Sequence, residues 1–387
     1  MPSTRPDLEF QDGMCDACFS AMRKYGSSSE SVDWAARKEE IQRIVNSAKT
    51  HKSSPYDCII PVSGGKDSVY QVHIAKHELN LNPLCLYFYP TLRTPLGAEN
   101  LETLSRMGVD MFQIKQNPII YEQLVLEGFK RIGDMEWPNH NGIWSSPFRV
   151  AVAFNIPIIL WGEGRSEYSG NFFINEKDKS QMDEDWTTDF GCLNGLRPDD
   201  MIDEKNGITS NDMAMYKFPS KEALNSVGGN IGVKGYFLGY YFKWDIREIT
   251  DFICNQYGWK KHPGRQEHSY MGTKGLDCLS SNLSDYLKFC KYGYSRATDD
   301  ACMDVRGGYI CRGEAVRLAE RYDGLYPKLA ITKFCDHFNM SEDEFNAICD
   351  KFTNPNIFQT KDGKFMRDID NSLVMKQSVL DSRRNPD

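Results

Sequence analysis

Residues 63–68 read Ser-Gly-Gly-Lys-Asp-Ser and bring together two hydroxyls, two glycines, a cation and a carboxylate in consecutive positions. Adjacent glycines reach backbone angles that other residues avoid, so successive amide N–H groups can converge on one anion. The hydroxyls and the lysine add further hydrogen-bond donors and a positive charge. The sequence therefore predicts a loop that binds phosphate groups.

This loop follows a predicted strand, 57–62, and precedes a predicted helix, 67–79. A helix that begins directly after such a loop adds unpaired N–H groups and the positive end of its dipole. The pattern differs from the common P-loop, in which four residues separate the first glycine from Gly-Lys-Ser/Thr. The alternative is a glycine-rich turn without a ligand, and the strand–turn–helix context of the motif argues against it.

Strands and helices alternate around the loop. The predicted strands are 57–62, 84–89, 110–114 and 157–161, and the predicted helices are 67–79, 97–107, 119–132 and 146–155. This alternation predicts an α/β fold of the Rossmann-like type, with a parallel sheet and helices on both faces. Ligands of such sheets bind outside the carboxyl ends of the strands, where the loop lies.

Composition shifts divide the chain into four predicted segments. These are a Cys-containing and helical segment 1–54, an α/β domain 55–260 with a polar insertion at about 171–230, a mainly helical region 261–375, and a disordered tail 376–387.

The overall composition is that of a globular protein with an acidic balance. The net charge is −8, with 40% hydrophobic and 26% charged residues, which disfavours a nucleic-acid partner. No apolar run approaches the length of a transmembrane helix. The first residues lack the apolar core of a secretory signal, so we expect the twelve cysteines to lie in the reducing cytoplasm.

A second strand end carries candidate site residues: Trp161, Gly162 and Glu163, followed by Glu167 and Tyr168. Gly162 would permit close approach of the backbone to a nucleotide. Glu163 or Glu167 could hold a metal ion or a hydroxyl group. The alternative is a loop whose glutamates are simply solvated.

Blocks in the same order along nearly the whole chain resemble the N-acetyl sugar amidotransferases of surface-polysaccharide and O-antigen biosynthesis. That family is a branch of the PP-loop ATP pyrophosphatases. The similar blocks are 56–68, 161–168, 238–245, 285–299 and 304–324. The loop alone identifies the superfamily, whereas the block 285–299 is the most distinctive of the branch.

The resemblance implies an ATP- and Mg²⁺-dependent reaction of lipopolysaccharide biosynthesis. The acetamido group of a nucleotide-linked N-acetyl sugar, of the UDP-sugar acid type, becomes an acetamidino group through adenylylation of the amide oxygen. Ammonia would come from a glutaminase and a cyclase-like subunit. The partners expected are thus a sugar nucleotide and these two subunits, without nucleic acid or membrane insertion, and homo-oligomerisation is left open.

The resemblance also implies roles for individual residues. The candidate catalytic residues are Lys66, Asp67, Glu163, Lys288 and Arg296. The candidate ATP-binding residues are Ser63, Gly64, Gly65, Lys66, Asp67, Ser68, Trp161 and Gly162. The candidate substrate-binding residues are Glu167, Tyr168, Glu267, Lys288, Lys291 and Arg296. For Asp67 the alternative is a cap of the helix that follows.

The three basic residues of the distinctive block have a second interpretation. Lys288 and Lys291 would share one face of a helix, and surface charges of this kind are usually just solvated. The surrounding tyrosines and phenylalanine favour a site, in which Arg296 could grip a phosphate or a sugar carboxylate bidentately.

Cys15 and Cys18 form a CxxC pair. The family that the chain resembles carries two such pairs, and four thiolates would close a tetrahedral zinc site. Only one pair is present here, so zinc would need further ligands, for which Cys278, Cys302 or a histidine are candidates.

Two other functions are compatible with the loop. A PP-loop tRNA sulfurtransferase would also adenylylate an oxygen, but the acidic charge and the absence of a basic stripe argue against it. A nucleotide-binding protein without turnover is the other alternative, against which the intact loop with Lys66 argues.

Overall fold

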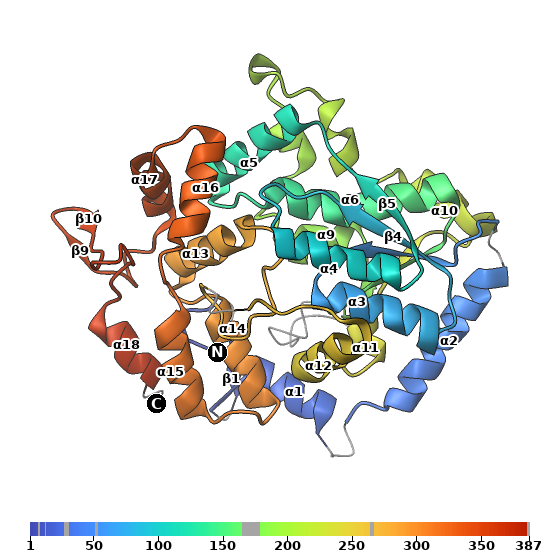
Figure 1. The fold of residues 1–387 in the computed structure, drawn as a ribbon, viewed down its shortest axis with the longest axis horizontal. Coiled ribbons are helices and arrows are strands. Elements are labelled where there is room, and N and C mark those ends of the chain that lie inside the picture. Colours follow the sequence, from blue (N-terminus) through green and yellow to red (C-terminus); the bar gives the residue numbers. More distant parts are fainter. Residues whose placement is uncertain are drawn as a thin grey trace.

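The computed structural model describes residues 1–6, 8–11, 13–26, 31–50, 53–164, 179–263 and 267–384. At its centre is a six-stranded sheet with the order β5-β4-β3-β6-β8-β7 (Figure 1). The strands are β3 (Cys58–Val62), β4 (Pro83–Phe88), β5 (Asp110–Ile114), β6 (Ile158–Trp161), β7 (Gln181–Met182) and β8 (Lys234–Phe237). All neighbours pair in parallel except β7, which is antiparallel to β8 at one edge.

The central strands form because their residues are apolar on both faces, as expected for strands covered by helices on two sides. Strands β4 and β6 are buried along their whole length. The four predicted strands are confirmed to within about a residue at each end. β7 and β8 were not predicted, because β8 reads Lys-Gly-Tyr-Phe and lacks a run of β-branched residues.

Helices cover both faces of the sheet, which confirms the predicted α/β architecture. One face packs against α2 (Trp34–Thr50), α3 (Lys66–His73), α4 (Pro95–Arg106) and α12 (Ile246–Tyr257). The other face packs against α5 (Pro118–Ile132) and α6 (Trp137–Phe154). A π-helical turn, η1 (Ile74–Glu78), extends α3.

The C-terminal part is mainly helical, as predicted, and lies to one side of the sheet (Figure 1, orange to red). Its elements are α13 (Ser280–Tyr292), α14 (Arg296–Arg306), α15 (Arg312–Tyr322), α16 (Lys328–Phe338), α17 (Glu342–Phe352), β9 (Thr360–Lys361), β10 (Lys364–Phe365) and α18 (Gln377–Arg384). Phe129 of α5 packs against Phe334 and Phe345, with ring centroids 5.7 and 5.0 Å away. The core of these helices is therefore continuous with one face of the sheet.

The tail at 376–387 was expected to be disordered, and this is wrong for most of it, because α18 spans Gln377–Arg384. Arg383 donates to the carbonyl of Gly293, and Arg384 forms an ion pair of 2.6 Å with Glu320. Val379 and Leu380 also pack against the core, but no residue of this helix is fully buried, so its apolar pattern is too weak to predict it.

The remaining described elements flank the sheet. They are β1 (Phe10–Gln11), β2 (Met14–Cys15), α1 (Asp16–Tyr25), α9 (Glu184–Phe190), η2 (Pro198–Met201), η3 (Glu204–Asn206), η4 (Asp212–Tyr216), α10 (Lys221–Asn230) and α11 (Leu238–Tyr241). The polar insertion contributes buried side chains to the core, among them Trp186 and Met213. Among the helices that the structure describes, none is both long and apolar enough to cross a bilayer.

Candidate functional site

The predicted phosphate loop connects the end of β3 to the first turn of α3. Gly64 has φ +84°, and a Cβ atom there would lie 2.8 Å from the backbone nitrogen of Leu101. Only glycine accommodates both the backbone angle and the close approach. Gly65 is the N-cap of α3, and no side chain caps this end. The first N–H groups of the helix therefore remain for a ligand.

The two serines hold the loop in shape. The backbone N–H of Ser63 donates to Oγ of Ser68 at 2.9 Å, and that of Gly65 donates to Oγ of Ser63 at 3.2 Å. Each hydroxyl oxygen thus accepts a backbone hydrogen bond and keeps its own proton for donation. Trp259 donates its ring N–H to the carbonyl of Gly64 at 2.9 Å. The loop is preorganised to donate hydrogen bonds to an anion.

Lys66 is buried, with 2% of its surface exposed, and it forms an ion pair with Asp67. Burial lowers the pKa of its ammonium group, but the carboxylates of Asp67 and Glu163 raise it, and the net pKa lies above the ordinary value. Lys66 therefore stays charged. A fixed cation of this kind stabilises negative charge that develops on phosphate oxygens.

Asp67 is held from two sides. Its Oδ2 pairs with Lys66, and its Oδ1 accepts from the ring N–H of Trp244 at 3.2 Å. The interpretation of Asp67 as a helix cap is wrong, because Gly65 occupies the N-cap without a side-chain hydrogen bond. Asp67 instead orients the ammonium group of the loop lysine.

A cavity of about 250 Å³, the loop cavity, opens beside this loop. Its lining residues are Pro61, Val62, Ser63, Asp67, Ser68, Gln71, Leu86, Tyr87, Phe88, Pro90, Asn139, Ile143, Trp144, Ser146, Pro147, Trp161, Gly162, Glu163, Phe237 and Asp277. The structure thus brings the loop serines and Asp67 together with Trp161, Gly162 and Glu163. Two blocks about 100 residues apart in the sequence form one site.

Gly162 lets β6 approach the loop helix. A Cβ atom at this position would lie 2.5 Å from the amide nitrogen of Gln71 and 3.3 Å from the ring of Trp244. With the Gln71 amide oriented to suit its neighbours, its oxygen accepts from the N–H of Gly162 and its nitrogen donates to the carbonyl of Pro61. The ends of β3 and β6 are therefore joined through one side chain of α3.

Two residues of α6 in the cavity wall were not predicted. Oδ1 of Asn139 and Oγ of Ser146 are buried and have no hydrogen-bond partner within the part of the chain that the structure describes. Such groups are costly unless a ligand or water satisfies them. The helix was expected to begin at 146 but begins at Trp137. The available signal was Pro138, because proline is favoured in the first turn of a helix.

Asp277 closes the cavity from the C-terminal part of the chain. Its carbonyl accepts from the N–H of Thr94 at 2.9 Å. Gly97 allows the contact, because a Cβ there would lie 2.5 Å from Cα of Asp277. Burial raises the pKa of the Asp277 carboxyl to about 6. Asp277 lies in a loop without periodicity, so only the tertiary structure reveals it.

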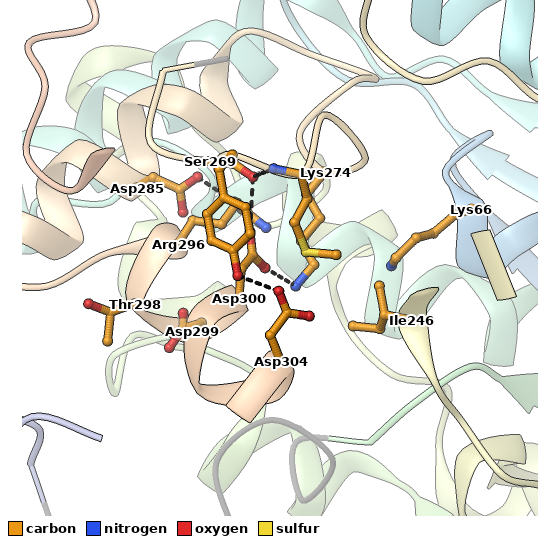
Figure 2. A network of polar contacts seen from close by, with 12 residues as sticks. Lys66, Ile246, Ser269, Lys274, Asp285, Arg296, Thr298, Asp299, Asp300 and Asp304 are labelled. Carbon is orange, nitrogen blue, oxygen red and sulfur yellow. Dashed lines mark hydrogen bonds and ion pairs between the residues drawn. The ribbon is translucent and has the colours of Figure 1, made fainter. Parts of the chain in front are cut away.

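Two of the predicted basic residues bind carboxylates of their own region. Lys288 forms an ion pair with Asp299, and Nε of Arg296 lies 2.5 Å from Oδ2 of Asp285. Both residues lie outside the lining of the loop cavity. Figure 2 shows Arg296 and Asp285 joined within a polar network of the C-terminal part. Their contact with a substrate stays a prediction.

Lys291 has a structural contact. Its ammonium group donates to the carbonyls of Ile132 and Gly133, at 2.8 and 2.9 Å, at the end of α5. Burial raises the pKa of Glu267, which lies outside the loop cavity. The predicted residues Glu167 and Tyr168 lie outside the described residues.

Carboxylates of α14 face the loop lysine across the boundary between the two regions. Asp300 forms an ion pair of 2.7 Å with Lys274 and accepts from Ser269 at 2.9 Å. Its charge also contributes to the raised pKa of Lys66. Figure 2 shows the ammonium group of Lys66 pointing toward this network. The C-terminal helices therefore add to the electrostatic surroundings of the loop.

The CxxC pair does not form a recognisable metal site. Cys15 and Cys18 lie beside each other, and their thiol–thiol hydrogen bond lowers the pKa of Cys15. Across the residues that the structure describes, no three His, Cys, Asp or Glu side chains are grouped to hold a metal ion. Neither Cys278 nor Cys302 completes such a group, so the structure gives the zinc prediction no support.

Part of the chain is similar in sequence to a curated relative. The uncharacterized protein MJ1599 of Methanocaldococcus jannaschii is 29% identical over 119 residues, which are 30% of this chain. The matched part spans 39% of that curated relative's length.

Two solved structures are similar in part. An NH3-dependent NAD synthetase from Campylobacter jejuni, in complex with nitrate, is 16% identical over 35% of this chain and 59% of its own, with a TM-score of 0.29. The NMN synthetase of Francisella tularensis is 14% identical over 58% of this chain and 87% of its own, with a TM-score of 0.28. These TM-scores are too low to support a statement about fold or activity.

The C-terminal part matches a described family. Residues 246–370 fit the family model of the LPS biosynthesis protein WbpG-like, C-terminal domain. The match includes α12 to α17 and the network that faces Lys66. It confirms the relationship to surface-polysaccharide biosynthesis that the sequence blocks predicted. Residues 246–370 of this chain are therefore similar to the C-terminal domain of the WbpG-like LPS biosynthesis proteins.

Proposed function

We propose that this chain is an ATP-dependent amidotransferase of lipopolysaccharide biosynthesis. It converts the acetamido group of a nucleotide-linked N-acetyl sugar into an acetamidino group. The observation that carries the proposal is a preorganised anion-binding loop whose buried, charged lysine, Lys66, pairs with Asp67, and Asp67 lines a cavity together with Glu163. The family match of the C-terminal part supports the pathway.

The loop would hold the pyrophosphate part of ATP. The hydroxyls of Ser63 and Ser68 and the first N–H groups of α3 donate hydrogen bonds, and Lys66 supplies positive charge. The cavity beside them, with aromatic and apolar side chains in its wall, is of a type that accepts the remainder of a nucleotide. Ser63 and Lys66 thus act where charge builds up during pyrophosphate release.

The donor set also suits Mg²⁺. Asp67 and Glu163 both line the cavity, and carboxylate oxygens together with phosphate oxygens are the ligands that Mg²⁺ prefers. When bound there, Mg²⁺ would neutralise part of the phosphate charge.

The proposed reaction has two steps. The amide oxygen of the acetamido group attacks the α-phosphorus of ATP, the bond from that phosphorus to the pyrophosphate oxygen breaks, and an O-adenylyl imidate forms. Lys66 and the loop donors stabilise the leaving pyrophosphate. Neutral ammonia then attacks the imidate carbon, the carbon–oxygen bond breaks, AMP leaves, and the added nitrogen loses a proton.

Ammonia delivery belongs to the same proposal. A glutaminase would produce ammonia, and a cyclase-like subunit would pass it to this chain, all in the cytoplasm. Free ammonium should replace both subunits at sufficient concentration, because the chemistry at the sugar needs ammonia alone.

The test is mass spectrometry of UDP-N-acetyl sugar acids incubated with the full chain, ATP, Mg²⁺ and ammonium. The expected product is one mass unit lighter than the substrate, since NH replaces oxygen, and AMP appears in equal amount. No mass change with any sugar of a broad panel would overturn the assignment. AMP formation that requires tRNA and a sulfur donor would identify a sulfurtransferase instead.

A further inference from the structure

A second cavity, of about 380 Å³, lies between α1, the segment 243–248 and α14 with the turn that follows it. We call it the seam cavity. Its volume is within the range of sites that bind small molecules. It shares none of its lining residues with the loop cavity. The proposed function therefore leaves it without a role.

One side chain connects the walls of the two cavities. Trp244 lines the seam cavity, and its ring N–H donates to Asp67, which lines the loop cavity. The ring of Trp244 also lies close to Gly162 on the loop-cavity side. A molecule in the seam cavity would therefore approach the loop at the Lys66–Asp67 pair, beside the ATP of the proposed reaction.

The wall of the seam cavity is rich in cations although the whole chain carries a net charge of −8. The cationic residues in the wall are Lys24, Lys243, Arg247 and Arg306, and the carboxylates are Asp245, Glu248 and Asp304. Cations from three different elements converge on one cavity, which is the arrangement expected for a ligand with several negative charges.

Two of the three carboxylates form hydrogen bonds or ion pairs with other groups of the protein. Asp304 binds the guanidinium group of Arg247 through both oxygens, at 2.7 and 2.5 Å, and accepts from the hydroxyl of Tyr270. Asp245 caps α12 by accepting from the N–H groups of Arg247 and Glu248, at 2.9 and 3.0 Å. Asp304 and Arg247 neutralise each other, and the first N–H groups of α12 stabilise the charge of Asp245. The positive charge of the wall therefore comes from Lys24, Lys243 and Arg306.

The remaining wall suits the uncharged parts of a nucleotide. Met271 and Met303 contribute apolar and adaptable surface. Tyr25 and Tyr309 contribute aromatic rings, and the guanidinium group of Arg247 lies 5.1 Å from the ring centre of Tyr309. Aromatic rings of this kind stack on bases and on the apolar faces of sugars.

We propose that the seam cavity binds the nucleoside diphosphate of the acceptor sugar. Its phosphates lie against Lys243 and Arg306, and its base packs against Tyr25 or Tyr309. The acetamido group then reaches past Trp244 to the Lys66–Asp67 pair. This inference rests on the proposed function, and it adds a separate site for each of the two nucleotides.

The experiment measures binding to the full chain by calorimetry, with UDP and UDP-N-acetylglucosamine as probes and α,β-methylene-ATP for the loop. Lys243→Gln removes a solvent-exposed charge from the cavity wall, so it should leave the fold intact. We expect it to weaken binding of both UDP probes about 5- to 10-fold, as loss of one charge-assisted contact does. Binding of the ATP analogue should not change.

Matched variants sharpen the result. Lys243→Arg should bind the UDP probes nearly as the wild type does, and Lys351→Gln, at an exposed position on α17, should have no effect. Equal binding of UDP by Lys243→Gln and wild type, or no UDP binding by the wild type, would overturn the inference. So would a loss of ATP-analogue binding as large as the loss of UDP binding.

The two proposals can fail separately. If the wild type makes the acetamidino product and Lys243→Gln has the same KM for the sugar nucleotide, the seam cavity is not the acceptor site although the function stands. If Lys243→Gln selectively weakens UDP binding and no product forms with any sugar, the site stands and the proposed reaction fails.

Discussion

The loop at 63–68 and the basic residues at 288–296 were both predicted as site residues, and the structure uses their charges differently. In the loop, Lys66 pairs with Asp67, which lines a cavity. In the C-terminal helices, Arg296 pairs with Asp285 and joins α13 to α14. Each region holds a cation beside a carboxylate. An ion pair alone therefore does not identify a ligand-binding site. What distinguishes the loop is the cavity beside it and its hydrogen-bond donors that are available to a ligand.

The largest expected effect is at Lys66. Lys66→Ala removes the cation that would stabilise the leaving pyrophosphate, so AMP formation should fall by about a thousandfold. AMP is measured chromatographically, and circular dichroism checks that the fold persists. Lys66→Arg, which keeps the charge, should retain more activity than Lys66→Ala. Undiminished turnover in the alanine variant would show that the loop is not the reaction centre.

A substitution at Arg296 tests whether the ion pair of the C-terminal helices is structural. Arg296→Met leaves the buried carboxylate of Asp285 without its cation and should lower the free energy of unfolding by about 2 kcal/mol. Denaturant titration measures this loss. The double variant Arg296→Met/Asp285→Leu should recover part of it, because it removes the unpaired charge as well.

Kinetics of the same Arg296 variant distinguish a structural residue from a site residue. If the pair is structural, KM for the sugar nucleotide stays near the wild-type value. If the unfolding free energy is unchanged and KM is strongly raised, Arg296 instead belongs to the substrate site and, like Lys66, acts on a ligand.

Asp277 gives a smaller, pH-dependent effect. Burial raises its pKa from the ordinary 3.8 to about 6, so the folded state is penalised once the carboxyl ionises. Its contribution to stability is highest at pH values below about 4 and is lost as the pH rises through about 6. Asp277→Asn should therefore stabilise the chain by roughly 1–2 kcal/mol at pH 7.5 and by little at pH 4. Thermal melts at both pH values measure the difference, and an equal shift at both would refute the assignment.

The smallest effect is expected at Lys291. Lys291→Met removes the hydrogen bonds to the carbonyls at the end of α5 and should cost about 1 kcal/mol of unfolding free energy. The rate of AMP formation should not change. Lys351→Met, at an exposed position, is the control for stability. Loss of sugar-nucleotide binding in Lys291→Met would show that this lysine contributes to the substrate site.

Local sequence was sufficient for the strands β3 to β6 and for the loop, but not for β7 and β8. The apolar runs of β3, β4 and β6 predict buried strands because both of their faces must be covered. The adjacent glycines predict backbone angles that other residues avoid. The structure shows such an angle at Gly64, with φ +84°, whereas Gly65 has an ordinary φ of −67°. The start of α6 and the helix α18 lie outside the predicted elements. Pro138 is the only local signal for the first, and α18 buries no residue.

The sequence by itself determined the chemistry of the loop, because its donors, its lysine and its backbone angles are encoded in six consecutive residues. Only the tertiary structure decided which distant groups share the loop cavity: Glu163 from the segment after β6, Ser146 from α6 and Asp277 from the C-terminal part. The physical reason is that the effect of a charge depends on its neighbours and on its exposure. For side chains 100 or 200 residues apart, the packing of helices on the sheet sets both.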